Sequence, residues 1–398
     1  MMMHIPFHMN ALVVEHNNSY ALQEVPVPES FMHESILIDV KAVAANPMDW
    51  KFLECDLAPE GSIAGCDAAG VIVKLGDSEV EAKEINSKYG LKVGDFVSGF
   101  VHGMSSTHPE NGAFANYCWI DAGASIKFNP KDKHGFEKTK ALGDHIPGNE
   151  IIDSFEKAAS LPSSLFTAAM VFLVNLNKRI DFDNDEWQDT NSKLLVYGGS
   201  TSFALHLLQI NKLVKGFKNV ITISSKKHDQ ALTNFNVSEN FDYRNPEFEK
   251  DIVKKHHDIE YIIDCVSNQE TFKNAYKIAN DVVKDGHHKV HLINLAGLSN
   301  DVIDEAKRND DRIINSSTSL FSMETFPMSY GPFKIIPDPI YRKTALKNIA
   351  KLNKAILNGQ YKTIPVKINE KSGFEGVESA VSGIKKGKNS GEKFVVRM

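Results

Sequence analysis

Between residues 194 and 295, short apolar runs alternate with segments that have the periodicity of helices. The runs at 194–197, 220–224, 261–266 and 290–295 are almost continuously apolar. Continuous apolar runs are typical of strands that helices cover on both faces of a parallel sheet. Helices are expected between them at residues 202–214, from 227 onward, at 248–255 and at 271–280. This half of the chain therefore predicts an α/β unit with a parallel sheet.

The first third has a different texture, with short β-branched runs separated by proline and glycine. Strands are expected at residues 11–14, 35–43, 70–75 and 95–100. Short strands with frequent breakers indicate a barrel-like or sandwich-like domain.

Three further segments complete the pattern. Residues 155–175 are largely apolar and predict a helix that only Pro162 interrupts, whereas 180–193 are acidic and polar and predict a surface loop. The tail predicts a helix at 341–357 and two short strands, at 363–368 and 393–396. This mixture indicates a tail that folds back onto the first domain.

Composition narrows the classes of partner. The chain has 398 residues and a net charge of −6, and an acidic chain is a poor ligand for nucleic acid. Its four cysteines cannot form a disulfide framework or a CxxC-based zinc site. With no sustained apolar stretch of about 20 residues, we expect no membrane insertion. The expected compartment is the cytoplasm, with the nucleus left open.

Residues 194–204 predict a strand, a tight turn of small residues and the start of a helix. In that geometry backbone N–H groups and a helix N-terminus face a pyrophosphate. The residues expected at a dinucleotide are Gly198, Gly199, Ser200, Thr201 and Ser202. Thr201 and Ala204 stand where the usual motif has glycines, so a plain strand-to-helix turn capped by Ser and Thr is the alternative.

The next strand bears on the choice between NADH and NADPH. NAD-binding sheets usually place an acid at its end, to accept a hydrogen bond from the ribose 2′-OH. Here the strand runs into residues 224–228, which contain no acid. Ser225 and Lys226, with Lys227 beside them, are expected at a 2′-phosphate, and the predicted cofactor is NADPH. The alternative is a solvated strand end.

Motifs over nearly the whole chain resemble those of the zinc-independent medium-chain dehydrogenases/reductases, in particular fungal quinone-oxidoreductase-like and enoyl-reductase-like members. The similar segments are Asn46-Pro47-Met48-Asp49-Trp50-Lys51, Gly65-Cys66-Asp67-Ala68-Ala69-Gly70, Val93-Gly94-Asp95-Phe96-Val97, Asn111-Gly112-Ala113-Phe114-Ala115-Asn116-Tyr117, Gly198-Gly199-Ser200-Thr201-Ser202, Asp264-Cys265-Val266-Ser267-Asn268 and Asn389-Ser390-Gly391-Glu392-Lys393.

The resemblance implies a fold of two domains with an active site in the cleft between them. A β-rich GroES-like catalytic domain would comprise residues 1–158 and 335–398. A Rossmann domain with a doubly wound parallel sheet would comprise 159–334. The resemblance also places Tyr243, Val266, Ser267, Leu295 and Ala296 at the cofactor, although sheet packing is the alternative for the last four.

The zinc-dependent relatives hold catalytic zinc with a Cys, a Gly-His-Glu motif and a later Cys. Here Asn46 takes the first Cys position, and Cys66-Asp67 replaces His-Glu. These residues do not form the ligand set that zinc requires, so we expect no metal. We expect Cys66 to pack as a small buried residue rather than to act as a nucleophile.

Without zinc, hydrogen-bond donors must stabilise the negative charge that develops during reduction. Asn46 and Lys51 are the candidates. The Asn46 amide could donate to a substrate carbonyl or to the nicotinamide, and the Lys51 ammonium could offset charge on a substrate oxygen or hold the cofactor ribose. A turn before Pro47 and a solvated lysine are the structural alternatives. The tyrosine that mitochondrial-type enoyl reductases use as proton donor has no counterpart in residues 53–63, which leaves solvent as a proton source. The loops at 103–110 and 323–339 are expected to shape the substrate pocket.

We therefore expect an NADPH-dependent, zinc-independent oxidoreductase that transfers a hydride to a small carbonyl, quinone or activated-alkene substrate. We expect it to be a monomer or homodimer. The alternatives are a non-catalytic scaffold or NADPH sensor with the same fold and, third, a zinc alcohol dehydrogenase.

Overall fold

The computed structural model describes residues 5–128, 136, 140–285, 288–330 and 333–398. The chain divides into two compact units. Unit 1 comprises Met1–Phe166 and Phe321–Met398, and unit 2 comprises Thr167–Leu320.

Unit 2 contains a six-stranded parallel sheet in the order β11-β10-β9-β12-β13-β14. Its strands are β9 (Asp189–Tyr197), β10 (Phe217–Ile223), β11 (Glu239–Phe241), β12 (Ile259–Asp264), β13 (Val290–Asn294) and β14 (Ile313–Ser317). The order reverses direction between β9 and β12, and ligands of doubly wound sheets bind outside the carboxyl ends of the strands at such a switch point. The predicted parallel α/β sheet is confirmed.

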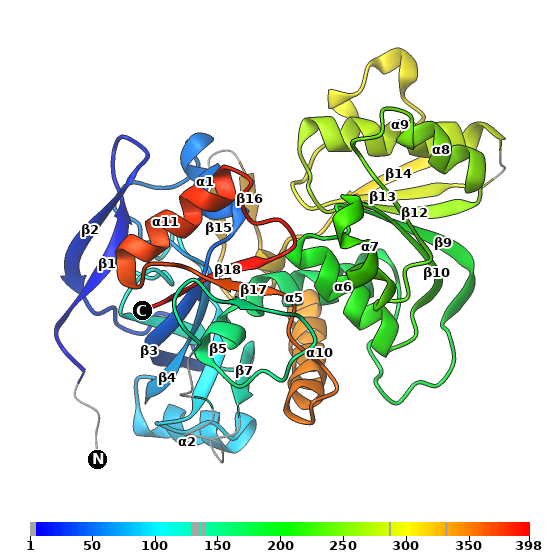
Figure 1. Ribbon diagram of the computed structural model, residues 1–398. Coiled ribbons are helices and arrows are strands. Elements are labelled where there is room, and N and C mark those ends of the chain that lie inside the picture. Colours follow the sequence, from blue (N-terminus) through cyan, green and yellow to red (C-terminus); the bar gives the residue numbers. More distant parts are fainter. Residues whose placement is uncertain (1–4, 129–135, 137–139, 286–287, 331–332) are drawn as a thin grey trace. The chain divides into compact units, whose positions relative to one another are not determined.

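The helices of unit 2 are α6 (Ser202–Leu213), α7 (Asp229–Thr233), α8 (Phe248–Lys255) and α9 (Gln269–Asp285). Figure 1 shows α8 and α9 side by side along one face of the strands, where both bury aromatic and aliphatic side chains in a shared core. The expected loop at 180–193 is wrong at its end, because β9 begins at Asp189, which pairs with Phe217. The start of this strand is polar because much of it is exposed.

Unit 1 is built on an eight-stranded sheet in the order β7-β5-β4-β3-β18-β17-β8, with β6 also paired to β3. Its strands are β3 (Ser35–Ala44), β4 (Asp67–Leu75), β5 (Phe96–Phe100), β6 (Tyr117–Asp121), β7 (Ser125–Phe128), β8 (His145–Ile146), β17 (Val366–Ile368) and β18 (Lys393–Arg397). The tail does fold back: β18, the last strand, pairs antiparallel with β3 (Figure 1).

Two hairpins and six helices complete unit 1 in the described part of the chain. The hairpins are β1 (His8–Val14) with β2 (Tyr20–Pro26), and β15 (Met328–Tyr330) with β16 (Phe333–Ile335). The helices are α1 (Pro47–Glu54), α2 (Glu79–Tyr89), α4 (Phe155–Ala159), α5 (Pro162–Met170), α10 (Pro339–Leu357) and α11 (Gly373–Lys385). Helix α5 crosses the boundary between the units and continues into a π-helical turn, Val171–Asn175.

The segment Phe155–Asn175 is long and apolar enough to cross a membrane by length and composition. The same segment is 67% buried inside the protein over its most apolar window. Burial of that extent is typical of a core helix, so the segment is weak evidence for a membrane span.

Candidate functional site

The turn between β9 and α6 lies at the switch point of the sheet in unit 2. Gly198 has a φ of +81°, and a Cβ atom added to it would lie 2.8 Å from Cγ2 of Val266. The N–H groups of Gly198 and Gly199 both donate to the carbonyl oxygen of Ile223, at 2.9 and 3.1 Å. The turn is thereby held against β10 and the end of β12, and only glycine fits its first position.

Helix α6 begins immediately after this turn. The Thr201 hydroxyl accepts from the N–H of Ala204 at 3.2 Å and caps the helix. Ser202 stands in the first turn, where N–H groups have no partner within the helix and face anions favourably. Ala204 is fully buried, so its methyl group packs inside the unit.

The ends of β12 and β13 are joined by one side chain at the same edge. Ser267 Oγ donates to the carbonyl oxygen of Asp264 at 2.6 Å and accepts from the N–H of Leu295 at 2.7 Å. Val266 and Ala296 flank this link and are exposed. The structure therefore brings Val266, Ser267, Leu295 and Ala296 to the edge that carries the glycine turn.

The ends of β10 and β11 hold the remaining predicted cofactor residues. Ser225 is buried, whereas Lys226 and Tyr243 are exposed. The side chain of Arg244, which the sequence reasoning missed, donates from Nη2 to Ser225 Oγ at 2.9 Å. Its position directly after Tyr243 was the available signal, because a residue after a strand end reaches the same edge.

An acid also lies at this edge, although it comes from β11 rather than β10. Asp242 accepts from Nη2 and Nε of Arg244 at 2.6 and 2.9 Å, and from the N–H of Lys226 at 3.4 Å. The hydrogen bonds from Arg244 hold the pKa of Asp242 well below its usual range. The carboxylate is therefore committed to Arg244, and the Lys226 side chain adds a further positive charge.

A buried polar cluster occupies the start of α1 in unit 1. The Asn46 side-chain amide donates to Asp67 Oδ2 at 2.8 Å and to the carbonyl oxygen of Ala44 at 3.3 Å. Its oxygen accepts from Lys393 Nζ and, at 3.2 Å, from Ser163 Oγ. Both amide hydrogens of Asn46 are thus used within the unit, which makes the side chain an anchor of the helix start.

Lys393 is the cation at the centre of this cluster, and its role was not foreseen. Its side chain is 4% exposed, and Nζ lies 3.1 Å from Oδ2 of the fully buried Asp67. Asp67 also accepts from the backbone N–H and the hydroxyl of Ser163, both at 2.7 Å. The ion pair is therefore saturated with hydrogen bonds, as a buried pair must be.

Asp49 and Cys66 are the two other ionisable groups of the cluster. Asp49 Oδ2 accepts from the backbone N–H of Asn46 at 2.6 Å, yet burial raises its pKa to about 7. Burial, with help from the charges of Asp49 and Asp67, also raises the pKa of the Cys66 thiol. A neutral buried thiol is a poor nucleophile and a poor metal ligand.

The donor set of this cluster does not fit zinc. The charge of Asp67 is already neutralised by Lys393, and an ammonium group in this position opposes a second cation. Among the residues that the structure describes, no three His, Cys, Asp or Glu side chains are placed to hold a metal ion.

Lys51 lies one turn along α1 from the cluster. Its side chain is half-buried, and Nζ lies 5.8 Å from the centre of the Trp50 ring. Asn46 and Lys51 are therefore on the same short element of unit 1, and the cluster fixes where that element begins.

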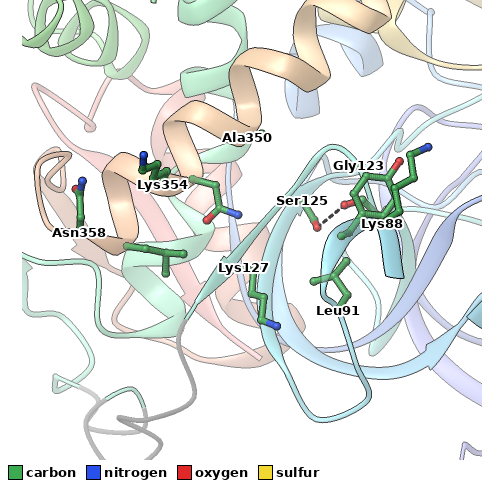
Figure 2. A pocket seen from close by; sticks show the side chains of 12 residues that line it. Lys88, Leu91, Gly123, Ser125, Lys127, Ala350, Lys354 and Asn358 are labelled. Atoms are coloured by element: carbon green, nitrogen blue, oxygen red, sulfur yellow. Dashed lines mark hydrogen bonds between the residues drawn. The ribbon is translucent and has the colours of Figure 1, made fainter. Parts of the chain in front are cut away.

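A surface hollow of about 500 Å³ lies elsewhere in unit 1, beside α10 (Figure 2). Its lysines include Lys88, which pairs with Glu34 at 2.7 Å, and Lys127, which pairs with Asp95 at 2.8 Å. The hollow contains none of the predicted site residues, and two of its lysines are already neutralised. The residues predicted from the sequence therefore lie in two separately described regions, α1 of unit 1 and the sheet edge of unit 2.

Comparison with known sequences places this geometry among oxidoreductases. Residues 33–130 match the alcohol dehydrogenase GroES-like domain. The chain is 34% identical over 393 residues to the uncharacterized protein YNL134C of Saccharomyces cerevisiae, covering 98% of both chains. It is 32% identical over 277 residues to the trans-enoyl reductase thnE of Trichoderma harzianum, and this match covers 68% of this chain and 67% of thnE. It is 28% identical over 400 residues to the trans-enoyl reductase FSL5 of Gibberella zeae, and this match covers 99% of this chain and 98% of FSL5.

Solved structures share the fold over almost the whole chain. The quinone oxidoreductase of Coxiella burnetii superposes with a TM-score of 0.62 at 16% identity, covering 98% of this chain and 99% of that one. The CurK enoyl reductase superposes with a TM-score of 0.64 at 14% identity, covering 99% of this chain and 100% of that one. A mycobacterial protein whose structure is complexed with NADPH superposes with a TM-score of 0.65 at 16% identity, covering 98% of this chain and 100% of that one.

Proposed function

The chain belongs to the medium-chain dehydrogenase/reductase family, and from this premise we propose that it is a zinc-independent NADPH-dependent reductase. Its proposed substrates are small molecules with an electron-poor carbon: a carbonyl compound, a quinone or an activated alkene. The names of the trans-enoyl reductase relatives favour the alkene conjugated to a carbonyl group.

One observation carries the proposal: every residue expected at the cofactor lies along a single edge of the parallel sheet in unit 2. The start of α6, directly after the glycine turn, supplies N–H groups suited to a pyrophosphate. Ser267 joins the ends of the two strands beyond the switch point. When bound there, the reduced nicotinamide supplies a hydride.

The side chains at the ends of β10 and β11 support NADPH over NADH. Arg244 is anchored on Asp242 and reaches Ser225, and Lys226 is exposed beside them. Two cations and a hydroxyl suit a 2′-phosphate, because charge-assisted hydrogen bonds to phosphate are strong. Asp242 is already engaged by Arg244, which disfavours its use on a ribose hydroxyl.

In unit 1 we propose that the Lys51 ammonium group offsets the negative charge that develops on the substrate oxygen. Asn46 is also proposed to contribute, chiefly by fixing the start of α1, because its amide hydrogens are donated to Asp67 and Ala44. Lys393 supports the proposal that no zinc takes part, since its charge already serves the carboxylate that a metal would need.

We further propose a monomeric or homodimeric enzyme of the cytoplasm that uses no nucleic-acid partner. Its acidic net charge of −6 supports the last point. Gel filtration with light scattering measures the oligomeric state.

The direct test combines cofactor binding with turnover of a substrate panel. Titration with NADPH and NADH should show binding of NADPH at micromolar concentration, and the protein should oxidise it with crotonaldehyde, menadione or benzaldehyde. Absence of NADPH binding contradicts the proposal. Binding without turnover of any panel member supports the scaffold or sensor instead, and stoichiometric zinc in the active protein contradicts zinc independence.

Arg244→Ala should weaken NADPH binding by about 10- to 30-fold and leave NADH binding unchanged, because one charge-assisted hydrogen bond to phosphate is lost. Fluorescence titration with the two cofactors measures both constants. Lys250→Ala is the matched control, since Lys250 is exposed and ion-paired with Glu247 on α8 of the same unit. Equal losses for both cofactors would place Arg244 outside the 2′-phosphate site.

Lys51→Met should lower kcat/KM for the best panel substrate by about 100-fold, the effect typical of removing one donor to a developing oxyanion. NADPH binding should change less than about threefold, because the charge that Lys51 is proposed to offset develops on the substrate. Lys51→Arg keeps the charge and should recover most of the rate. If Lys51→Met is as active as the parent, charge stabilisation lies elsewhere.

A further inference from the structure

The two loops expected to shape the substrate pocket are bound to each other in unit 1. Ser106 Oγ donates to the carbonyl oxygen of Ser329 at 2.9 Å, and Thr107 Oγ1 donates to that of Pro327 at 2.8 Å. These hydrogen bonds hold the strand β15 beside the segment that follows β5. Both loops were expected to shape the substrate pocket, and the structure shows that they are bound to each other. We call the two bound segments, residues 102–107 and 324–330, the wall.

His102 lies at the centre of this wall and touches two ionisable groups. Its Nε2 atom is hydrogen-bonded to the Tyr330 hydroxyl, and the two rings stack with centres 5.6 Å apart. Its Nδ1 atom lies 3.8 Å from Oε1 of Glu324. The side chains of His102 and Glu324 are 3% and 8% exposed, and Tyr330 is also buried. The imidazole is thus hydrogen-bonded to the phenol and lies near the carboxylate, and all three groups are buried.

The Nδ1 atom of His102 is buried and has no hydrogen-bond partner in the part of the chain that the structure describes. Beside it is a hollow of about 10 Å³ that His102, Glu324, Asn111 and Asp121 help to line. That volume is about the size of one water molecule, and the hollow has the polar partners that a buried water needs. A buried nitrogen atom without a partner destabilises the fold, and an apolar side chain would avoid that cost.

Charged and aromatic groups surround the side chains of His102, Glu324 and Tyr330. Arg342 pairs with Asp121 at 2.5 Å and also attracts Glu324, so the buried carboxylates share one cation. Phe321 packs on the His102 ring with centres 4.4 Å apart.

Tyr330 also touches the element that carries the proposed substrate residues. Its ring lies 4.6 Å from that of Phe52, the residue after Lys51 on α1. The wall and α1 therefore pack against each other in unit 1 through the rings of Tyr330 and Phe52.

We propose that Tyr330 is the proton donor of the reduction, and that His102 and Glu324 are positioning residues that orient and recharge it. The inference rests on the proposed function. Hydride transfer breaks a C–H bond of the reduced nicotinamide, forms a C–H bond on the electron-poor β-carbon of a conjugated alkene, and moves the π-electron pair toward the carbonyl oxygen as an enolate. The Tyr330 O–H bond then breaks, the enolate electron pair forms a C–H bond with that proton at the α-carbon, and the O–H electron pair stays on the phenolate. The phenolate recovers a proton from Nε2 of His102, whose Nδ1 atom takes one that derives from solvent.

Tyr330→Phe tests the donor. We expect kcat to fall about 30-fold, within the range for loss of a general acid, while KM and NADPH affinity change less than about threefold. Tyr117→Phe is the control, because Tyr117 belongs to the same unit but packs in other side-chain clusters. An unchanged kcat in Tyr330→Phe overturns the proposal while the activity of the parent upholds the proposed function. A parent that reduces no panel substrate overturns both.

A stereochemical readout separates proton donation from a merely structural role. Reduction of tiglaldehyde in deuterium oxide by the parent should place deuterium on one face of the α-carbon. Tyr330→Phe should give product deuterated on both faces, because solvent then supplies the deuteron. Retention of a single face in the variant overturns the proposal.

The relay is tested without cofactor or substrate through nitrogen NMR of the histidine side chains, with the His102 signal assigned by His102→Gln. Tyr330→Phe should shift the Nε2 resonance of His102, and Glu324→Gln should shift that of Nδ1. Glu324→Gln should also move the pH profile of kcat, with Asp121 and Arg342 unchanged as its charged neighbours. An unaltered His102 spectrum and an unaltered pH profile overturn the positioning roles, even if one of the other variants fails to fold.

Discussion

Replacing Lys393 by methionine should lower the free energy of unfolding by about 3–5 kcal/mol, because the carboxylate of Asp67 then stays buried without its cation. Lys393 Nζ also donates to Asn46 and, at 3.2 Å, to Ser164, so three polar side chains lose a partner together. Urea unfolding followed by circular dichroism and tryptophan fluorescence measures the loss.

Lys385→Met is the matched control for this variant. Lys385 pairs with Glu54 at 2.7 Å, but both side chains are about half exposed. Water replaces such a partner, so the expected loss is at most about 1 kcal/mol. Adding Asp67→Asn to Lys393→Met removes the unpaired charge and should restore part of the stability. Equal losses of unfolding free energy for the two lysine variants would show that the buried ion pair stabilises the fold no more than the exposed one.

The role of Lys393 also shows where prediction from the sequence ends. Both Lys393 and the Cys66-Asp67 pair belonged to motifs that carry the family resemblance. However, Asn46 and Lys393 are 347 residues apart in the chain. Only the pairing of β18 with β3 brings them together. Local patterns report which residues share an element, whereas contacts across a sheet depend on the order of its strands.

The sheet of unit 2 was predictable because its strands are buried on both faces and leave continuous apolar runs. Helix α2 was missed because its sequence is mostly polar and Ile85 is its one buried residue, so no apolar stripe marks it. Helix α11 was missed for another reason. Its buried face includes Gly376 and Gly383, and glycine is a poor helix former whose small side suits close packing.

The residues of the candidate site were likewise predictable only in part. Residues that follow strands, such as Ser225 and Ser267, were placed correctly at the sheet edge because the ends of parallel strands align. Arg244 was missed because its contact with Ser225 depends on the neighbouring strand β11. The cofactor roles of these residues stay predictions, and Arg244 now belongs with them.

Stability should also depend on pH through Asp49. Burial raises its pKa from 3.8 to about 7, although the N–H of Asn46 donates to it and acts in the opposite direction. Between these two values the folded protein holds a proton that the unfolded chain releases, so rising pH favours unfolding. The contribution of Asp49 is fully present below about pH 4 and is lost as pH rises through about 7. The change in the pKa of Asp49 from 3.8 to about 7 corresponds to about 4 kcal/mol of folding stability.

Asp49→Asn should remove this slope, because an amide stays neutral and its oxygen can still accept from Asn46. The measurement is the free energy of unfolding at several pH values between 4.5 and 8, with the parent and the variant compared at each. Asp77→Asn, on the exposed surface, controls for the loss of one carboxylate. The expected difference between parent and variant changes steadily in favour of the variant as pH rises. A constant difference would mean that Asp49 is ionised throughout, and the start of α1 would then carry a buried negative charge beside Lys393 at every pH.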